Sequence, residues 1–160
     1  MKKQPNSRMC FICGMKNIAG VHVAFYEQDD DTVLARFTGQ EIHQGYPERF
    51  HGGVLAGILD EALGRTIHTA YGEATMGVTV ELTTRYRKPV PLGVELTAVA
   101  RLVTDRLRAY ESTGEILLPD GTVAVEARGK FVKLADAALA QFDATAEEWR
   151  VWPDEAVSSE

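Results

Sequence analysis

The sequence predicts an α+β domain in which an antiparallel sheet packs against one long helix. Residues 52–70 carry apolar side chains at the period of an α-helix and form the longest segment of this kind. The segments before and after it show the alternating or β-branched patterns that are typical of strands. Short polar turns join these strands, which favours hairpins and therefore antiparallel pairing.

Two strands are predicted before the helix. Residues 21–26 are rich in β-branched and aromatic side chains, and residues 32–37 have a period-two pattern. The aspartates at 29–31 form the turn between them, and Gly39 ends the second strand. The polar loop 40–50 leads directly to the helix start, so we expect it to form one wall of a pocket there.

The central helix is predicted to run from Gly52 to about Ala70, with Gly72 as its stop signal. When the segment is projected at about 100° per residue, its apolar side chains fall on one broad face. This face consists of Val54, Leu55, Ile58, Leu59, Ala62, Leu63, Ile67 and Ala70. A face of this width must pack against a large element of the fold, most simply a sheet.

Strands continue after the helix. Val78, Val80 and Leu82 alternate with polar residues, which predicts a half-buried strand. Three more strands are predicted, at 94–105, 107–118 and 122–134. An Asp-Gly pair between the last two favours a tight hairpin.

The end of the chain has a different character. Residues 143–150 have the pattern of a short helix, with Thr145 and Glu148 at the spacing of a capping box. The last eight residues are polar and are predicted to be loose. We therefore divide the chain into a cysteine-containing leader at 1–19, one sheet-and-helix domain at 20–134, and a C-terminal extension with a short helix at 135–160.

Composition and charge limit the class of protein. The 160 residues are enough for one domain with a real core, and the net charge of −6 argues against a general nucleic-acid surface. No apolar run reaches the length of a membrane span, so no membrane partner is expected. The basic N-terminus is not followed by the hydrophobic core of a signal peptide, so the expected compartment is the cytoplasm.

One carboxylate on the helix has unusual neighbours. Gly53, Gly57 and Gly64 lie three, four or seven residues from Asp60, on the same side of the helix. Glycine inside a helix costs about 1 kcal/mol relative to alanine, so these glycines indicate that something approaches Asp60 closely. The alternatives without a functional role are an aspartate that is exposed to solvent and a Gly-Gly pair that only forms a tight turn.

Glu61 is the rival carboxylate. We favour Asp60 because Glu61 has Arg65 four residues later, the favourable order for a surface ion pair. Gly52 and Gly53 open the helix, where backbone N–H groups have no internal partner and can bind a negative charge or a polarised carbonyl oxygen.

These residues carry a family resemblance. A His51-Gly52-Gly53 turn with a carboxylate nine residues after the histidine resembles the hotdog-fold acyl-CoA thioesterases. After the helix, Gly-Val-Thr-Val at 77–80 and a later Tyr-x-x-Pro and Leu-Gly turn are similar to the same family, so the resemblance covers roughly residues 9–134. It implies a hotdog fold, in which the sheet wraps around one long central helix, and a homodimer or dimer of dimers with shared active sites.

The resemblance also implies roles for individual residues in the hydrolysis of an acyl-CoA. The Gly52 N–H would polarise the thioester carbonyl, and Asp60 would act as nucleophile or as general base for water. Thr79 would hold the water or orient the carboxylate, and His51 would orient the thioester or support the turn. Gly52 and Asp60 are about 12 Å apart by helical rise, so we expect each site to take one from each subunit.

Substrate-binding residues are predicted in two further places. A Gln or Asn side chain ahead of the His-Gly-Gly turn contacts the thioester region in related enzymes, and Gln44 matches it loosely here. In some members the amide stands one residue later, where this chain has Gly45. Gly53, at the helix start, is also predicted to bind substrate. The basic cluster of Arg85, Arg87 and Lys88 is a candidate contact for the coenzyme A phosphates, with a solvated strand end as the alternative.

Two cysteines stand in a Cys-Phe-Ile-Cys-Gly leader, which resembles one found ahead of a subset of hotdog thioesterases. Cys10 and Cys13 are half of a zinc site, to which His22 and the distant His43 could add ligands, and a redox pair is a second alternative. We expect two small buried thiols instead, with no metal, and no cofactor other than coenzyme A as part of the substrate.

Two other functions compete with thioester hydrolysis. A non-catalytic acyl-CoA-binding hotdog module, acting as a sensor or carrier partner, would have the same fold. A hotdog hydratase is disfavoured because that family pairs an aspartate with a histidine five residues later, where this chain has Arg65. The carboxylate beside glycines favours the hydrolase.

Overall fold

The computed structural model describes residues 1–154. Over this range it contains one seven-stranded antiparallel sheet in the order β1-β2-β3-β5-β6-β7-β4. The strands are β1 (Lys2–Lys3), β2 (Ala24–Glu27), β3 (Val33–Thr38), β4 (Gly77–Tyr86), β5 (Glu95–Asp105), β6 (Ala109–Leu117) and β7 (Val123–Lys133). The helices are α1 (Gly52–Gly64), α2 (Ile67–Tyr71) and α3 (Asp136–Leu139), with short 3₁₀ helices η1 (Glu41–His43) and η2 (Gly72–Ala74).

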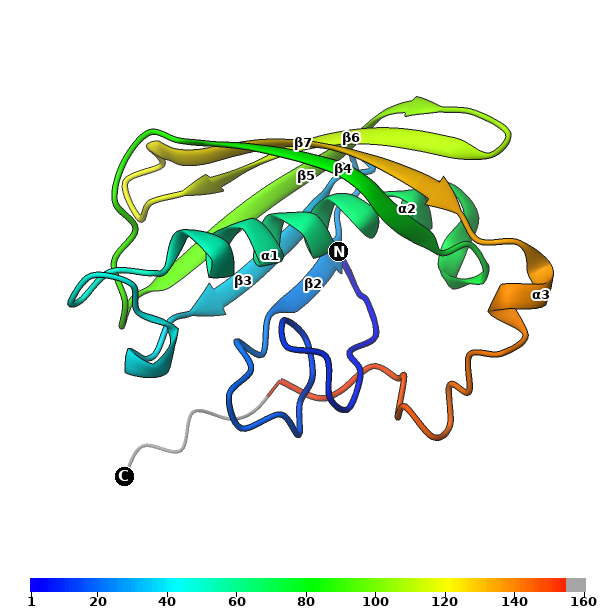
Figure 1. The fold of residues 1–160 in the computed structure, drawn as a ribbon, viewed down its shortest axis with the longest axis horizontal. Helices are drawn as coiled ribbons and strands as arrows, with labels where there is room; N and C mark the ends of the chain where they lie inside the picture. The colour runs from blue at the N-terminus through cyan, green and yellow to red at the C-terminus, as the bar shows by residue number, and fades with distance from the viewer. Residues whose placement is uncertain (155–160) are drawn as a thin grey trace.

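The sheet curves around α1, which contacts strands β3 to β7 (Figure 1). The predicted apolar face of the helix is buried from Leu55 to Ile67, whereas Val54 is half-buried and Ala70 is exposed. This arrangement is the hotdog fold, and the α+β prediction is confirmed. No helix among the described residues is long and apolar enough to cross a membrane.

The central helix is shorter than the sequence predicts. It ends at Gly64, and a separate short helix, α2, follows the break at Arg65 and Thr66. Thr66 Oγ1 donates to the Leu63 carbonyl at 2.8 Å and contacts Ser112 Oγ of the sheet at 2.6 Å. A hydroxyl that bonds backward to the preceding turn competes with regular helical bonding. Gly72, with a φ of +66°, ends α2 as predicted.

Strand β4 corrects the predicted pattern of Val78, Val80 and Leu82. A β-bulge between Thr79 and Glu81 shifts the alternation by one residue, so Thr79 and Leu82 both face the helix. Val78 and Val80 are 51% and 61% exposed. The valines therefore do not form the buried face of this strand. The strand lies at the edge of the sheet, and the bulge changes which of its residues face the helix.

The leader and the C-terminal extension run past the side of α1 that the sheet does not cover (Figure 1). They are joined by a β-bridge between Asn6 and Arg150 and by a hydrogen bond from the Arg8 N–H to the Glu147 carbonyl at 2.8 Å. These contacts join the two ends of the chain into one layer.

The helix predicted at 143–150 does not form. Asp143 Oδ1 instead accepts the N–H groups of Thr145 and Ala146, and Glu148 has a φ of +49°, which a right-handed helix cannot include. The short helix of the extension is α3, at Asp136–Leu139. The prediction of a loose end falls mainly on residues 155–160, outside the described residues, but Asp154 accepts a hydrogen bond from Tyr26 at 3.0 Å.

Candidate active site

The structure brings Asp60 and Thr79 together. Asp60 lies on α1 and is half-buried, and Thr79 Oγ1 on β4 donates to its Oδ1 at 2.7 Å. Burial raises the pKa of Asp60 above the ordinary value of an aspartate, whereas the hydrogen bond from Thr79 opposes this rise. A partly desolvated carboxylate of this kind is a stronger base than a fully solvated one.

The helix start is held by His51. Its Nδ1 accepts the Gly53 N–H at 2.9 Å, which caps the helix and uses the donor of Gly53 internally. Within residues 1–154, the Gly52 N–H has no hydrogen-bond partner. Of the two glycines, Gly52 is therefore the one whose N–H is available to a ligand.

Tyr86 is a site residue that sequence reasoning missed. Its hydroxyl donates to the Gly52 carbonyl at 2.6 Å, and its ring lies over the helix start, about 3.4 Å from where a Gly52 Cβ would stand. The Tyr-x-x-Pro pattern was the available sequence signal. It does not indicate that the end of the strand packs against the start of the helix. Gly45 packs there too, since a Cβ on it would lie 3.1 Å from the His51 Cα.

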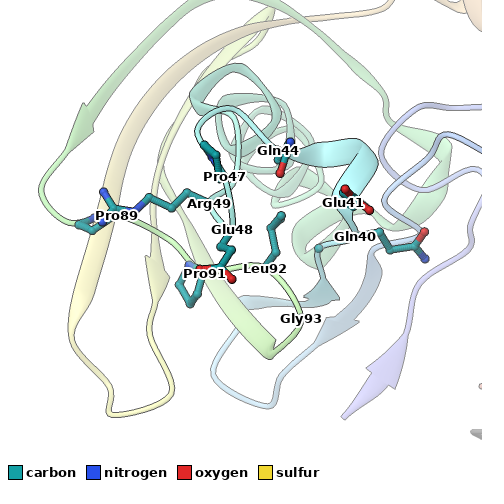
Figure 2. Close-up of a pocket in the computed structure, with 11 residues that line it drawn as sticks. Gln40, Glu41, Gln44, Pro47, Glu48, Arg49, Pro89, Pro91, Leu92 and Gly93 are labelled. Carbon is teal, nitrogen blue, oxygen red and sulfur yellow. The ribbon is translucent and has the colours of Figure 1, made fainter.

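Gln44 lines a different cavity. Figure 2 shows this pocket, of about 950 Å³, between the loop that contains Gln44 and the segment from Pro89 to Gly93. Neither Asp60 nor Thr79 lines it. The loop before the helix is thus a pocket wall, as predicted, but it does not meet the carboxylate within one chain.

The basic cluster lies on the outer face of the sheet. Arg85 lines a shallow groove there, on the face opposite to that of Thr79, and Arg87 pairs with Glu126 at 3.0 Å. Lys88 is exposed beyond the strand end. One chain therefore places the predicted substrate-binding residues away from Asp60.

Asp60 and Thr79 line a pocket of about 750 Å³. One side of it is formed by Asp60 and Glu61 of α1, by Arg65 directly after that helix, and by His68 of α2. The leader and the extension form the opposite side. His68 was not predicted, although its place eight residues after Asp60 could have indicated it. Burial and the nearby Arg65 lower the pKa of His68 to about 4, so its ring is neutral at pH 7.

The predicted ion pair between Glu61 and Arg65 forms, but not on the surface. Arg65 Nη2 lies 2.7 Å from Glu61 Oε1, and the arginine side chain is only 4% exposed. Its Nη1 donates to the Pro5 carbonyl of the leader at 2.8 Å. The leader covers this ion pair. The spacing of the two residues along the helix could not indicate that they are buried.

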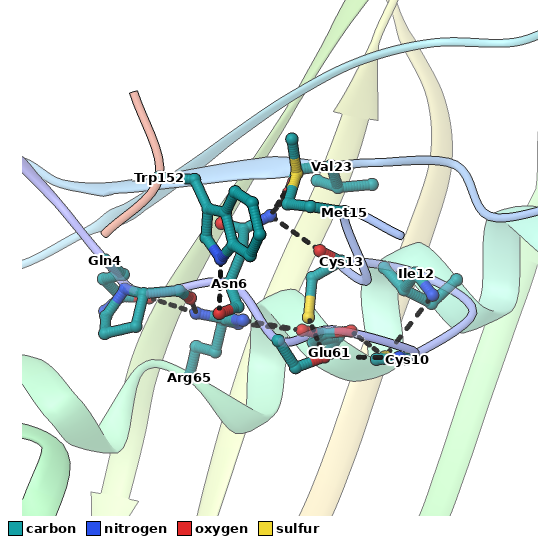
Figure 3. Close-up of polar contacts among 12 residues, drawn as sticks. Gln4, Asn6, Cys10, Ile12, Cys13, Met15, Val23, Glu61, Arg65 and Trp152 are labelled. Carbon is teal, nitrogen blue, oxygen red and sulfur yellow. Dashed lines mark hydrogen bonds and ion pairs between the residues drawn. The ribbon is translucent and has the colours of Figure 1, made fainter. Parts of the chain in front are cut away.

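The cysteines lie beside this pair. Cys10 Sγ donates to Glu61 Oε2 at 3.3 Å, and the two sulfurs and a Glu61 oxygen lie within 4.8 Å of one another (Figure 3). These are the described residues that could hold a metal ion, although Arg65 already neutralises the carboxylate. The expectation of two buried thiols holds for Cys13, whereas Cys10 is exposed. The neighbouring Cys13 side chain lowers the pKa of Cys10, whereas the Cys10 side chain and burial raise the pKa of Cys13.

The two histidines considered as zinc ligands are engaged elsewhere. His43 is buried, where its Nδ1 accepts the Gln40 N–H and its Nε2 lies 2.9 Å from the Ala19 carbonyl oxygen. His22 Nε2 lies 2.7 Å from the Asn17 carbonyl oxygen. Neither belongs to the cluster of Cys10, Cys13 and Glu61.

Comparisons with known proteins agree with this fold. A family model described as the thioesterase superfamily matches residues 49–104. The chain is 31% identical to acyl-coenzyme A thioesterase THEM4 of Bos taurus over 71% of its own length. The crystal structure of protein RHA08564, a thioesterase superfamily protein, matches with a TM-score of 0.70 and 34% identity, over 78% of this chain and 63% of that one. In sequence and in fold, the chain is similar to members of the thioesterase superfamily.

Another similar solved structure is that of the BH2602 protein from Bacillus halodurans with CoA. It matches with a TM-score of 0.58 and 27% identity, over 63% of this chain and 66% of that one. This chain spans about half the length of the curated relative, covering 46% of it. The match at 49–104 includes the helix start, Asp60, Thr79 and the basic cluster, whereas the leader and the extension lie outside it.

Replacing Thr79 by valine should shift the acid limb of the pH–activity profile of the protein to higher pH. Only an ionised Asp60 can act as base or nucleophile, and removal of the Thr79 hydrogen bond removes a contact that lowers its pKa. The measurement is kcat/KM against pH. Thr79→Ser, which keeps the hydroxyl, is the matched control and should retain the wild-type profile. An unshifted limb in Thr79→Val would show that this hydroxyl does not act on the titrating group.

Proposed function

We propose that the chain is an acyl-CoA thioesterase, which hydrolyses an acyl thioester to a carboxylate and free coenzyme A. The observation that carries the proposal is the half-buried Asp60, held by Thr79 at 2.7 Å in a pocket on the same helix whose start offers the Gly52 N–H. A relative named as an acyl-coenzyme A thioesterase and a relative crystallised with CoA support this substrate class.

The chemistry needs a polarised carbonyl and a nucleophile. The Gly52 N–H donates to the thioester oxygen and stabilises the negative charge that develops on it. Asp60 either takes a proton from water while the water oxygen attacks the carbonyl carbon, or attacks directly and forms an anhydride that water then opens. In both routes the carbon–sulfur bond breaks and coenzyme A leaves as its thiolate, which is then protonated.

The site is proposed to form between two subunits. Gly52 and Asp60 are eight residues apart on one helix, about 12 Å by helical rise, and one carbonyl cannot reach both within a chain. Strand β4, which carries Thr79, is a ten-residue edge strand with exposed Val78 and Val80. A long apolar edge strand can form hydrogen bonds with a strand of another chain. A homodimer through this edge, alone or within a dimer of dimers, would bring a second helix beside Asp60.

In this proposal coenzyme A is part of the substrate, and the protein uses no metal or other cofactor. Arg85, Arg87 and Lys88 are candidate contacts for its phosphates, from the outer face of the strand end. Gln44 is a candidate contact for the thioester region from the pocket before the helix.

An acyl-CoA panel with thiol release as readout tests the proposal. We expect at least one acyl-CoA to be hydrolysed at a rate that depends on Asp60, with equal rates in the presence of a strong chelator. The competing function is a non-catalytic acyl-CoA-binding module. Tight binding of acyl-CoA without any thiol release across the panel would favour that module and contradict the hydrolase.

A further inference from the structure

We propose that the pocket beside Asp60 binds the acyl group of the thioester, and that Phe142 and Trp149 of the C-terminal extension limit its length. This inference rests on the proposed thioesterase function and adds a substrate class to it. Both aromatic residues line the same pocket as Asp60 and Thr79. They lie outside residues 49–104, the segment that the family model matches.

The wall that carries these aromatic residues is fixed by many contacts. The Arg8 N–H donates to the Glu147 carbonyl at 2.8 Å, and Lys16 Nζ pairs with Glu148 at 2.9 Å. The β-bridge between Asn6 and Arg150 adds hydrogen bonds at both ends, at 2.9 and 3.3 Å. The leader therefore holds the extension over the helix face, and the pocket keeps its shape before a substrate binds.

The position of Trp149 is set by two neighbours. The Arg65 guanidinium lies 5.1 Å from the centre of its ring, and the Phe142 ring packs edge-on against it at 6.1 Å between centroids. Arg65 is itself held by Glu61 and by the Pro5 carbonyl. An aromatic pair held in this way forms a rigid end for a pocket, which is what selection by length requires.

The lining indicates the chemical class of the acyl group. Apolar side chains from the leader and from the sheet and its approach line the pocket, including Ile12, Met76 and Phe131, whereas α1 adds glycines and polar side chains. Asp143 and Glu147 lie at the same pocket, so an acyl group that ends in a carboxylate would be repelled. We infer an uncharged, largely apolar acyl group.

Two buried polar atoms at this pocket point to a ligand. Within the described residues, His68 Nδ1 and Trp149 Nε1 are buried and have no hydrogen-bond partner, and both side chains line the pocket. Buried polar groups in folded proteins are nearly always paired. His68, at 6% exposure, is neutral at pH 7 and is compatible with an uncharged occupant.

The test compares hydrolysis of butyryl-, octanoyl- and dodecanoyl-CoA by the full-length protein and its variants. Trp149→Ala and Phe142→Ala should each raise the dodecanoyl to butyryl ratio of kcat/KM by about 10-fold, because removing an aromatic ring opens space for further methylenes. Val151→Ala is the matched control, since Val151 is in the same segment, is 51% exposed and does not line the pocket. It should leave the ratio unchanged.

A binding readout keeps the inference testable if turnover is slow. The chain has two tryptophans, Trp149 and Trp152, so Trp149→Phe leaves one. In an Asp60→Asn background, octanoyl-CoA should change the tryptophan fluorescence, CoA alone should not, and the added Trp149→Phe change should abolish the response. If wild type hydrolyses acyl-CoA but the ratios and the fluorescence do not respond, this inference is wrong and the thioesterase stands. If wild type hydrolyses nothing while acyl-CoA still quenches Trp149, the pocket binds acyl groups and the proposed hydrolysis fails.

Discussion

Replacing Asp60 by asparagine is expected to lower kcat by about 10² or more, as for the loss of a catalytic carboxylate, while the fold survives. Asparagine keeps the size of the side chain and can still accept the Thr79 hydrogen bond, but it cannot act as a base or nucleophile. Thiol release from a good acyl-CoA substrate measures the effect.

The stability of this variant gives a second, independent measurement. Burial raises the folded-state pKa of Asp60, so the folded protein holds this proton more tightly than the unfolded chain. The ionised group therefore lowers stability as pH rises through that pKa, and this penalty is fully present above it. Asp60→Asn removes it, and we expect a Tm at pH 7 equal to or above that of the wild type.

Glu61→Gln is the control for the carboxylate assignment. Glu61 pairs with the buried Arg65 under the leader and should not contact the reacting atoms. Its loss should therefore lower stability, because it leaves a buried guanidinium without its partner charge, and should change kcat far less than Asp60→Asn does. If kcat falls more in Glu61→Gln, Glu61 is the catalytic group.

Mixing two inactive variants should restore activity if each site takes residues from two chains. Gly52→Val adds bulk at the helix start beside the Tyr86 ring and should block the approach of the carbonyl to the Gly52 N–H. Asp60→Asn removes the carboxylate. In a mixed dimer, one site carries both changes and the other carries neither.

The expected size of this rescue follows from random exchange. About half of the dimers are then mixed and each has one intact site, so roughly a quarter of wild-type activity should return. Subunit exchange and dimer formation are checked by native mass spectrometry of the mixture. Inactive mixtures of folded, fully exchanged dimers would place both groups in one chain and refute the shared site.

The sequence by itself determined the elements that depend on local periodicity. The apolar spacing around Leu55 and Ile58 predicts both the helix and the face that meets the sheet, because a helix or a strand must present its apolar residues at its own period. The same spacing placed Asp60 at the edge of that face, where the structure has a pocket. Antiparallel pairing followed from short turns.

Tertiary contacts decided what spacing cannot encode. The helix stops near Thr66, whose hydroxyl reaches Ser112 of the sheet, and the bulge in β4 turns Thr79 toward Asp60. The wall of the pocket depends on Arg65, which contacts Pro5 and the Trp149 ring from opposite ends of the chain. Such contacts join residues that are far apart in sequence, so only the packed structure determines which side chains surround the carboxylate.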